Sequence, residues 1–201
     1  MNGRLYPRLG MYLRELPDGV DSYPDRVAKA SLYQVMRDLC EIAVDPARVP
    51  EPIAALFDRP PPKNRWIPEV HSVAAHVALF DASGLRESEF MELAESYTAN
   101  IAASPMYRAL AFFTSPRRLF SGAAKRWEHI HQGLPLEIHF DAENKRATID
   151  MRHPPNLWNS LAHDWTASSW GPLLRMSNAT GGDVDVRHSG PTGARFEVHW
   201  E

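Results

Sequence analysis

Apolar residues recur at helical spacing through the first two thirds of the chain. Residues 5–16 and 26–44 each place leucine, valine or methionine on one face, and Asp25 is suited to cap the second segment. A third helix is predicted over residues 67–83, with Pro68 in its first turn and Gly84 at its end. Residues 1–132 are therefore predicted to form a helical part, whose remaining helices cover residues 85–104, 106–113 and 117–131.

The hydrophobic period changes at Gly133. Residues 136–140 and 146–151 alternate apolar and polar side chains around a short turn, which is typical of a hairpin with one buried face. Residues 183–188 and 194–200 alternate in the same way, and the stretch between the two hairpins is helical at least to Trp170. The predicted fold class is α+β: residues 133–201 form a hairpin–helix–hairpin with a four-stranded antiparallel sheet, in one domain over residues 1–201.

Composition and charge exclude several classes of partner. The chain has 201 residues and a net charge of −3, with acidic and basic residues mixed throughout. The most basic segment carries four cations on one predicted helix, which is typical of a solvated face, so no nucleic-acid partner is expected. No secretory signal and no apolar stretch of about 20 residues is present. The single cysteine, Cys40, suits a reducing compartment, and a cytoplasmic location is expected.

The histidines raise the question of a metal site. His129 and His131 are two residues apart, so on a helix their side chains diverge by about 200° and cannot share an ion. A metal site at this pair would require the helix to end before His129. Both are predicted to be solvated residues at a helix end. His71 and His76 are also wrongly spaced for a shared ion on their helix. The outward face of the sheet carries a set of acidic residues and histidines: Glu137, His139, Asp150, Glu197 and His199. These residues are predicted to form charge pairs across the strands, and a metal site on this face is the alternative.

Aromatic residues are the better clue to function, because no nucleophile elbow, phosphate-binding loop or dinucleotide-binding fingerprint is present. The six tryptophans can form a core between helix and sheet, or they can line an apolar pocket at that junction. For the pocket we predict ligand-binding roles, with no catalytic residue, for Tyr107, Arg108, Trp127, Trp158, Asn159 and Trp165.

Several segments resemble a family of about this length that is abundant in myxobacteria and has no assigned function. They are YPRLGMYLRELPDGVDSYPDRVAKASLYQVM, WIPEV, SPMYRALAFFTSPRRLF and the closing FEVHW. The order of elements also resembles the ligand-binding fold of heme nitric-oxide sensors, vinyl-reductase-type domains and vesicle-trafficking subunits. That resemblance implies heme for the sensor branch, but the Tyr-x-Ser-x-Arg element is missing and the stretch AASPMYRALAFF lacks the axial histidine. Heme is disfavoured, and no cofactor is predicted.

Two functions of different classes are consistent with these observations. The first is a non-catalytic sensory or regulatory module that binds a small apolar or amphipathic molecule between its helices and its sheet. The second is a protein–protein interaction or dimerisation module in signalling, whose signature is an exposed apolar patch on the helical part. The interaction module would dimerise or dock a signalling partner, and a homodimer is the candidate assembly.

Overall fold

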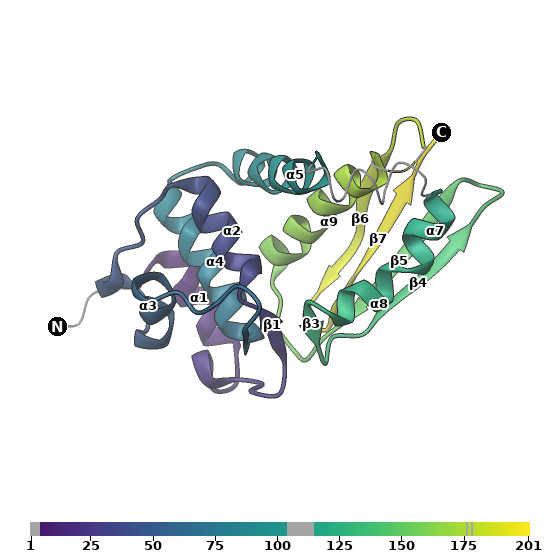
Figure 1. The fold of residues 1–201 in the computed structure, drawn as a ribbon. Coiled ribbons are helices and arrows are strands. Elements are labelled where there is room, and N and C mark those ends of the chain that lie inside the picture. The colour runs from purple at the N-terminus through teal and green to yellow at the C-terminus, as the bar shows by residue number, and fades with distance from the viewer. Residues whose placement is uncertain (1–4, 104–114, 176, 178) are drawn as a thin grey trace.

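The computed structural model describes residues 5–103, 115–175, 177 and 179–201. The first helices gather at the end of the molecule that carries the N-terminus, and the long strands lie at the other end (Figure 1). Of the described part of the chain, no helix is long and apolar enough to cross a membrane. The helices of the first half are α1 (Pro7–Glu15), α2 (Ser31–Cys40), α3 (Glu51–Asp58), α4 (Glu69–Ser83) and α5 (Glu87–Ala103), with single 3-10 turns at Gly19–Asp21 and Pro46–Arg48.

The four-stranded antiparallel sheet confirms the predicted fold class. Its strand order is β4-β5-β7-β6, so the two hairpins join along the β5–β7 pair. One face of the sheet is buried, as the alternation predicts: Ala147, Ile149 and Phe196 have no exposed surface. The elements that build this half are β4 (Leu136–Asp141), β5 (Arg146–Arg152), α9 (Ser160–Arg175), β6 (Asp183–Gly190) and β7 (Gly193–His199).

A second, three-stranded sheet was missed by the sequence analysis. It has the order β2-β1-β3 and joins the very short strands β1 (Val27–Lys29), β2 (Trp66–Pro68) and β3 (His131–Gln132). The prediction of one helix over 26–44 is therefore wrong for its first residues. Ala28 is fully buried and pairs with Ile67 on one side and His131 on the other. The partners are distant in sequence, so the local period could not reveal the pairing.

Other helix boundaries also differ from the predicted ones. Residues 117–131 do not form one helix but α7 (Pro116–Ser121) and α8 (Ala123–Glu128), which meet at Gly122. Ser115 caps α7 by accepting from the Arg118 backbone N–H at 3.4 Å, as Ser-Pro predicts. Helix α9 continues through Pro172 to Arg175. The helix expected over residues 106–113 lies outside the described residues.

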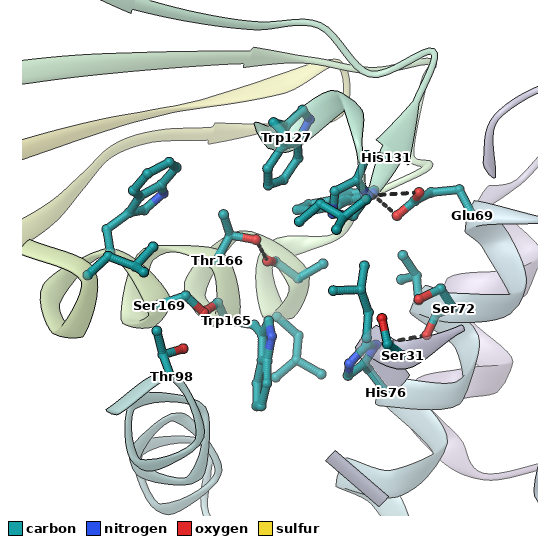
Figure 2. Close-up of a pocket in the computed structure, with 18 of the residues that line it drawn as sticks. Ser31, Glu69, Ser72, His76, Thr98, Trp127, His131, Trp165, Thr166 and Ser169 are labelled. Carbon is teal, nitrogen blue, oxygen red and sulfur yellow. Dashed lines mark hydrogen bonds and ion pairs between the residues drawn. The ribbon is translucent and has the colours of Figure 1, made fainter. Parts of the chain in front are cut away.

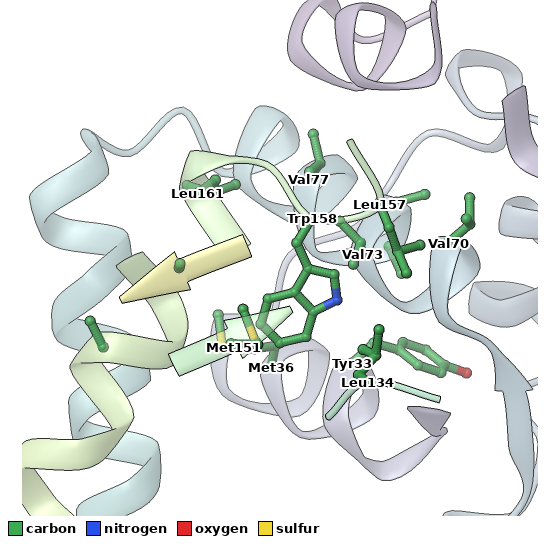
Figure 3. Packing of buried hydrophobic residues seen from close by; sticks show 14 of the residues in the cluster. Tyr33, Met36, Val70, Val73, Val77, Leu134, Met151, Leu157, Trp158 and Leu161 are labelled. Carbon is green, nitrogen blue, oxygen red and sulfur yellow. The ribbon is translucent and has the colours of Figure 1, made fainter. Parts of the chain in front are cut away.

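The core is continuous from the first helices to the inner face of the sheet. Helix α4 supplies much of it, since Val70, Ala74 and Leu79 have no exposed surface. At the boundary between the two halves, the Trp158 indole lies between side chains from both, with Met36 of α2 and Met151 of β5 nearby (Figure 3). Burying an aromatic side chain of this size is a large apolar contribution, so Trp158 ties the two halves together.

Candidate functional site: an apolar cavity between helices and sheet

A cavity of about 510 Å³ lies where α4 and α2 face α8, α9 and α5. Its volume falls within the usual range of small-molecule sites, about 300 to 1,000 Å³. Most of its wall consists of aromatic and aliphatic side chains, and the hydroxyl-bearing residues Thr98, Thr166 and Ser169 lie among them (Figure 2). Thr166 and Ser169 each donate to a backbone carbonyl four residues earlier on α9, at 2.9 and 3.1 Å. The hydroxyls therefore present mainly acceptor lone pairs to the cavity.

The structure brings half of the predicted ligand-binding residues to this cavity. Trp127, Trp158 and Trp165 lie in its wall. Asn159 is not among the described wall residues, because its Oδ1 accepts from the Ala162 backbone N–H at 3.0 Å, at the start of α9. Tyr107 and Arg108 lie outside the described residues. Ligand binding by any of these residues stays a prediction.

Glu69 is a site residue that sequence reasoning missed. It is the first residue of α4 and only 1% of it is exposed. Its Oε1 accepts from the Trp158 indole N–H and its Oε2 lies beside His131 Nδ1, each at 3.0 Å. The helix N-terminus also favours a negative charge at this position. The buried carboxylate thus has partners from the second half of the chain, 89 and 62 residues further along.

His131 corrects the prediction of a solvated helix-end histidine. Helix α8 ends at Glu128, and His131 lies in β3 with only 5% of its surface exposed. Its ring stacks on Trp127 at 4.0 Å between centroids and meets the edge of Trp158 at 5.5 Å. His129, by contrast, is exposed as predicted. Because the helix ends before the two histidines, His131 lies in the wall of the cavity.

Two further polar groups of the wall are buried and have no hydrogen-bond partner among the described residues. His76 Nδ1 donates to the Ser72 carbonyl at 2.8 Å, and its Nε2 meets no partner in that part of the chain. Burial lowers the pKa of His76, which keeps the imidazole neutral at pH 7. The indole N–H of Trp170 is likewise buried and without an acceptor. Unsatisfied buried polar groups cost about 1 to 3 kcal/mol each, so a ligand with matching groups would gain from meeting them.

Behind Trp158 lies a second histidine cluster. His153 Nε2 and His163 Nε2 are 2.9 Å apart, and His163 Nδ1 lies 2.7 Å from the Ser189 hydroxyl. His153 Nδ1 faces the Pro154 carbonyl at 2.9 Å and therefore carries a proton. One consistent arrangement follows: His163 donates to His153, and Ser189 donates to His163. The cluster joins the end of β5, α9 and β6 in a neutral network.

This cluster predicts a loss of stability in acid. Burial, and then repulsion from His153 and His188, lowers the pKa of His163 from its ordinary 6.5 to about 4. Between these values the unfolded chain binds a proton that the folded chain does not, so stability falls as the pH drops from 6.5 to 4. The expected loss is at most about 3 kcal/mol.

Urea unfolding at pH 7 and pH 4.5 measures that loss. His163→Gln is expected to lose clearly less stability than the wild type between the two pH values. Part of the dependence of stability on pH is expected to remain in this variant, because the pKa values of His71, His76 and His153 are also lowered. His139→Gln, at an exposed position, is the control and should keep the wild-type slope. An unchanged slope in His163→Gln would rule out this assignment.

The outward sheet face is held by charge pairs. Arg195 Nε lies 2.7 Å from Asp150, and Arg187 Nε lies 2.8 Å from Glu197. No group of three or more histidine, cysteine or acidic side chains that could hold a metal is found over residues 5–103, 115–175, 177 and 179–201. Asp150 and Glu197 thus take part in cross-strand charge pairs, one of the two interpretations that the sequence left open.

Comparison with solved structures identifies the fold. A mutant of the T. Tengcongensis H-NOX is similar with a TM-score of 0.54 at 11% identity, over 85% of this chain and 94% of that one. A mutant of Cs H-NOX that carries 4-cyano-L-phenylalanine is similar with a TM-score of 0.50 at 10% identity, over 86% of this chain and 96% of that one. A third structure, from work on the mechanism of H-NOX activation, is similar with a TM-score of 0.51 at 9% identity, over 86% of this chain and 94% of that one. The chain has an H-NOX-like fold. No protein-family model and no curated protein matches it.

The described wall residues offer few partners for the propionates of heme, the group that the resemblance in the sequence implies. Heme carries two negatively charged propionates, which need cationic partners. In the described wall Arg126 is the one lysine or arginine, and its guanidinium already donates to the Leu119 carbonyl. The buried Glu69 carboxylate would add repulsion at the same wall. The described residues are better matched to a neutral ligand.

Proposed function

We propose that this protein is a non-catalytic sensory or regulatory module that binds a small, neutral, apolar or amphipathic molecule. The ligand site is the cavity between the helices of the first half and α9. The observation that carries the proposal is the cavity itself, which combines an aromatic wall with a polar cluster at Glu69 and His131. Apolar pockets with a few oriented polar groups are the usual form of small-ligand sites.

The composition of the wall supports a sensing role. Its residues come from both halves of the chain, with Val73 and Val77 on α4 facing Leu161 and Trp165 on α9. A bound molecule would contact both halves at once, and its occupancy would change how strongly they are held together. That coupling is what a regulatory module needs.

Filling the cavity is the direct test. Ala123, on α8, lines the cavity, whereas its neighbour Ala124 is not among the described lining residues. Ala123→Phe is expected to weaken binding of 4-benzylphenol, a two-ring probe with one hydroxyl, by about tenfold or more. The physical reason is that the added ring occupies the ligand's space. Isothermal titration calorimetry gives the dissociation constants.

Ala124→Phe is the matched control, because it adds the same ring at the neighbouring position. It is expected to bind 4-benzylphenol as the wild type does, and circular dichroism checks that both variants are folded. Binding that is equally strong in all three proteins would place the probe outside the cavity. A wild type that shows no binding would contradict the proposed function.

The alternative function, an interaction module, predicts an exposed apolar patch on the helical part. Among the described residues, Met11 of α1 is the exposed large hydrophobic side chain. The cavity is the more specific observation and favours the ligand-binding function.

A further inference from the structure

We infer that the ligand presents a hydrogen-bond donor, a hydroxyl or N–H group, to Nε2 of His131. This inference rests on the proposed function and specifies the chemistry of the same site. The geometry that carries it is the chain of contacts from Trp158 through Glu69 to His131, at the wall of the cavity. It makes His131 a ligand-contacting residue and Glu69 a positioning residue.

The contacts of Glu69 determine which nitrogen of His131 carries the proton. A carboxylate only accepts hydrogen bonds, so each group that faces Glu69 at hydrogen-bond distance must donate to it. Oε1 is taken by the Trp158 N–H, and Oε2 faces His131 Nδ1 at 3.0 Å. Nδ1 must therefore be the donor. In the neutral ring, Nε2 is then left as a bare acceptor.

Among the described residues, the contact of Nδ1 with Glu69 is the one hydrogen bond of the His131 ring, and neighbouring groups hold the ring in place. Trp127 stacks on its face, Trp158 closes one edge, and β3 pairs its backbone with Ala28. An acceptor in an apolar wall gains most from a ligand donor, because leaving it unpaired when water is displaced costs free energy. An ether or ketone, which only accepts, would be repelled at this position.

Glu69→Gln should reverse the role of His131. The Trp158 N–H only donates, so the amide oxygen of the new glutamine must face it. The amide NH₂ group then faces His131 Nδ1 and donates to it. His131 has to carry its proton on Nε2, which becomes a donor toward the cavity. A single change of one oxygen to nitrogen thus changes the preferred ligand group without altering the size of the wall.

Three probes of one shape measure that preference: diphenylmethane, 4-benzylphenol and its methyl ether 4-benzylanisole. Each affinity is divided by that for diphenylmethane in the same protein, which cancels changes in cavity shape. At pH 8, where an ordinary imidazole is neutral, the wild type is expected to prefer the phenol over the ether roughly fivefold to tenfold. In Glu69→Gln the ratio is expected to fall to about 1, because both oxygens can accept. His131→Phe should lose the preference as well.

His129→Gln, two residues away and exposed, is the control and should keep the wild-type ratio. Equal affinity of the wild type for phenol and ether would overturn this inference while the proposed function stands. A preference for the phenol that persists in Glu69→Gln would also overturn it, since the donor contact would lie elsewhere. Failure of all three probes to bind the wild type would instead contradict the proposed function itself.

Discussion

Replacing Glu69 with leucine is expected to lower the free energy of unfolding by about 3 to 5 kcal/mol. The change leaves the Trp158 indole N–H and His131 Nδ1 buried without their shared acceptor. Removing one member of a buried, hydrogen-bonded polar cluster costs this much because the remaining groups stay dehydrated and unpaired. The cost is large here because Glu69, His131 and Trp158 are deeply buried, with exposed fractions of 1%, 5% and 5%.

Urea unfolding followed by circular dichroism measures this effect, and Glu87→Leu is its control. Glu87 is also the first residue of a helix, but 44% of its side chain is exposed and it pairs with Arg8 at 3.0 Å on the surface. Losing an exposed pair should cost less than about 1 kcal/mol. If Glu69→Leu were no less stable than Glu87→Leu, the polar cluster would not hold the two halves together as described.

Gly193→Ala is the second large expected effect, a loss of at least about 3 kcal/mol or failure to fold. A Cβ at position 193 would lie closer to the Met151 carbonyl oxygen than two unbonded heavy atoms can approach. The carbonyl oxygen and the Cα that would carry the new Cβ both belong to the backbone of the β5–β7 pair, where the two hairpins join, so neither can move without breaking the register. Overpacking against backbone is costly because no rotamer change relieves it.

Gly190 provides the matched control, because it pairs with Gly193 across the same hairpin end. A Cβ there would meet the His188 side chain, whose Nε2 lies 2.8 Å away and can rotate aside. Gly190→Ala is therefore expected to change the thermal midpoint by only a few degrees, about 1 kcal/mol or less. Equal midpoints for the two variants would contradict the close approach at Met151.

The elements that the sequence predicts well are those whose signal is local. Alternating side chains in residues 136–151 and 183–200 indicate the two hairpins without reference to any partner. Gly84 ends α4 in the left-handed region at φ +66°, as its position after the apolar run predicts. Strands β1, β2 and β3, with three residues or fewer each, carry no such period. Their existence depends on pairing between distant segments.

The candidate site divides in the same way. The tryptophan content predicts an aromatic wall, and Trp127, Trp158 and Trp165 lie in it. Glu69 could not be recognised, because an acid in the first turn of a helix is ordinarily a solvated residue that favours the dipole. His131 lacked a local signal as well, because α8 ends at Glu128 and no glycine or proline follows it before the histidine. The prediction of a solvated His131 was wrong because it assumed that the helix continued to that residue.

The three-stranded sheet has a consequence for how such a chain can change over time. β3 crosses from the second half to pair with β1 of the first, and the Glu69–His131 contact crosses the same boundary. Recombination that replaced one half of the chain with the matching half of a distant homologue would break the β1–β3 pairing and the Glu69–His131 contact at once. Viable variation is therefore expected to arise by point substitution within the intact chain rather than by shuffling of its parts.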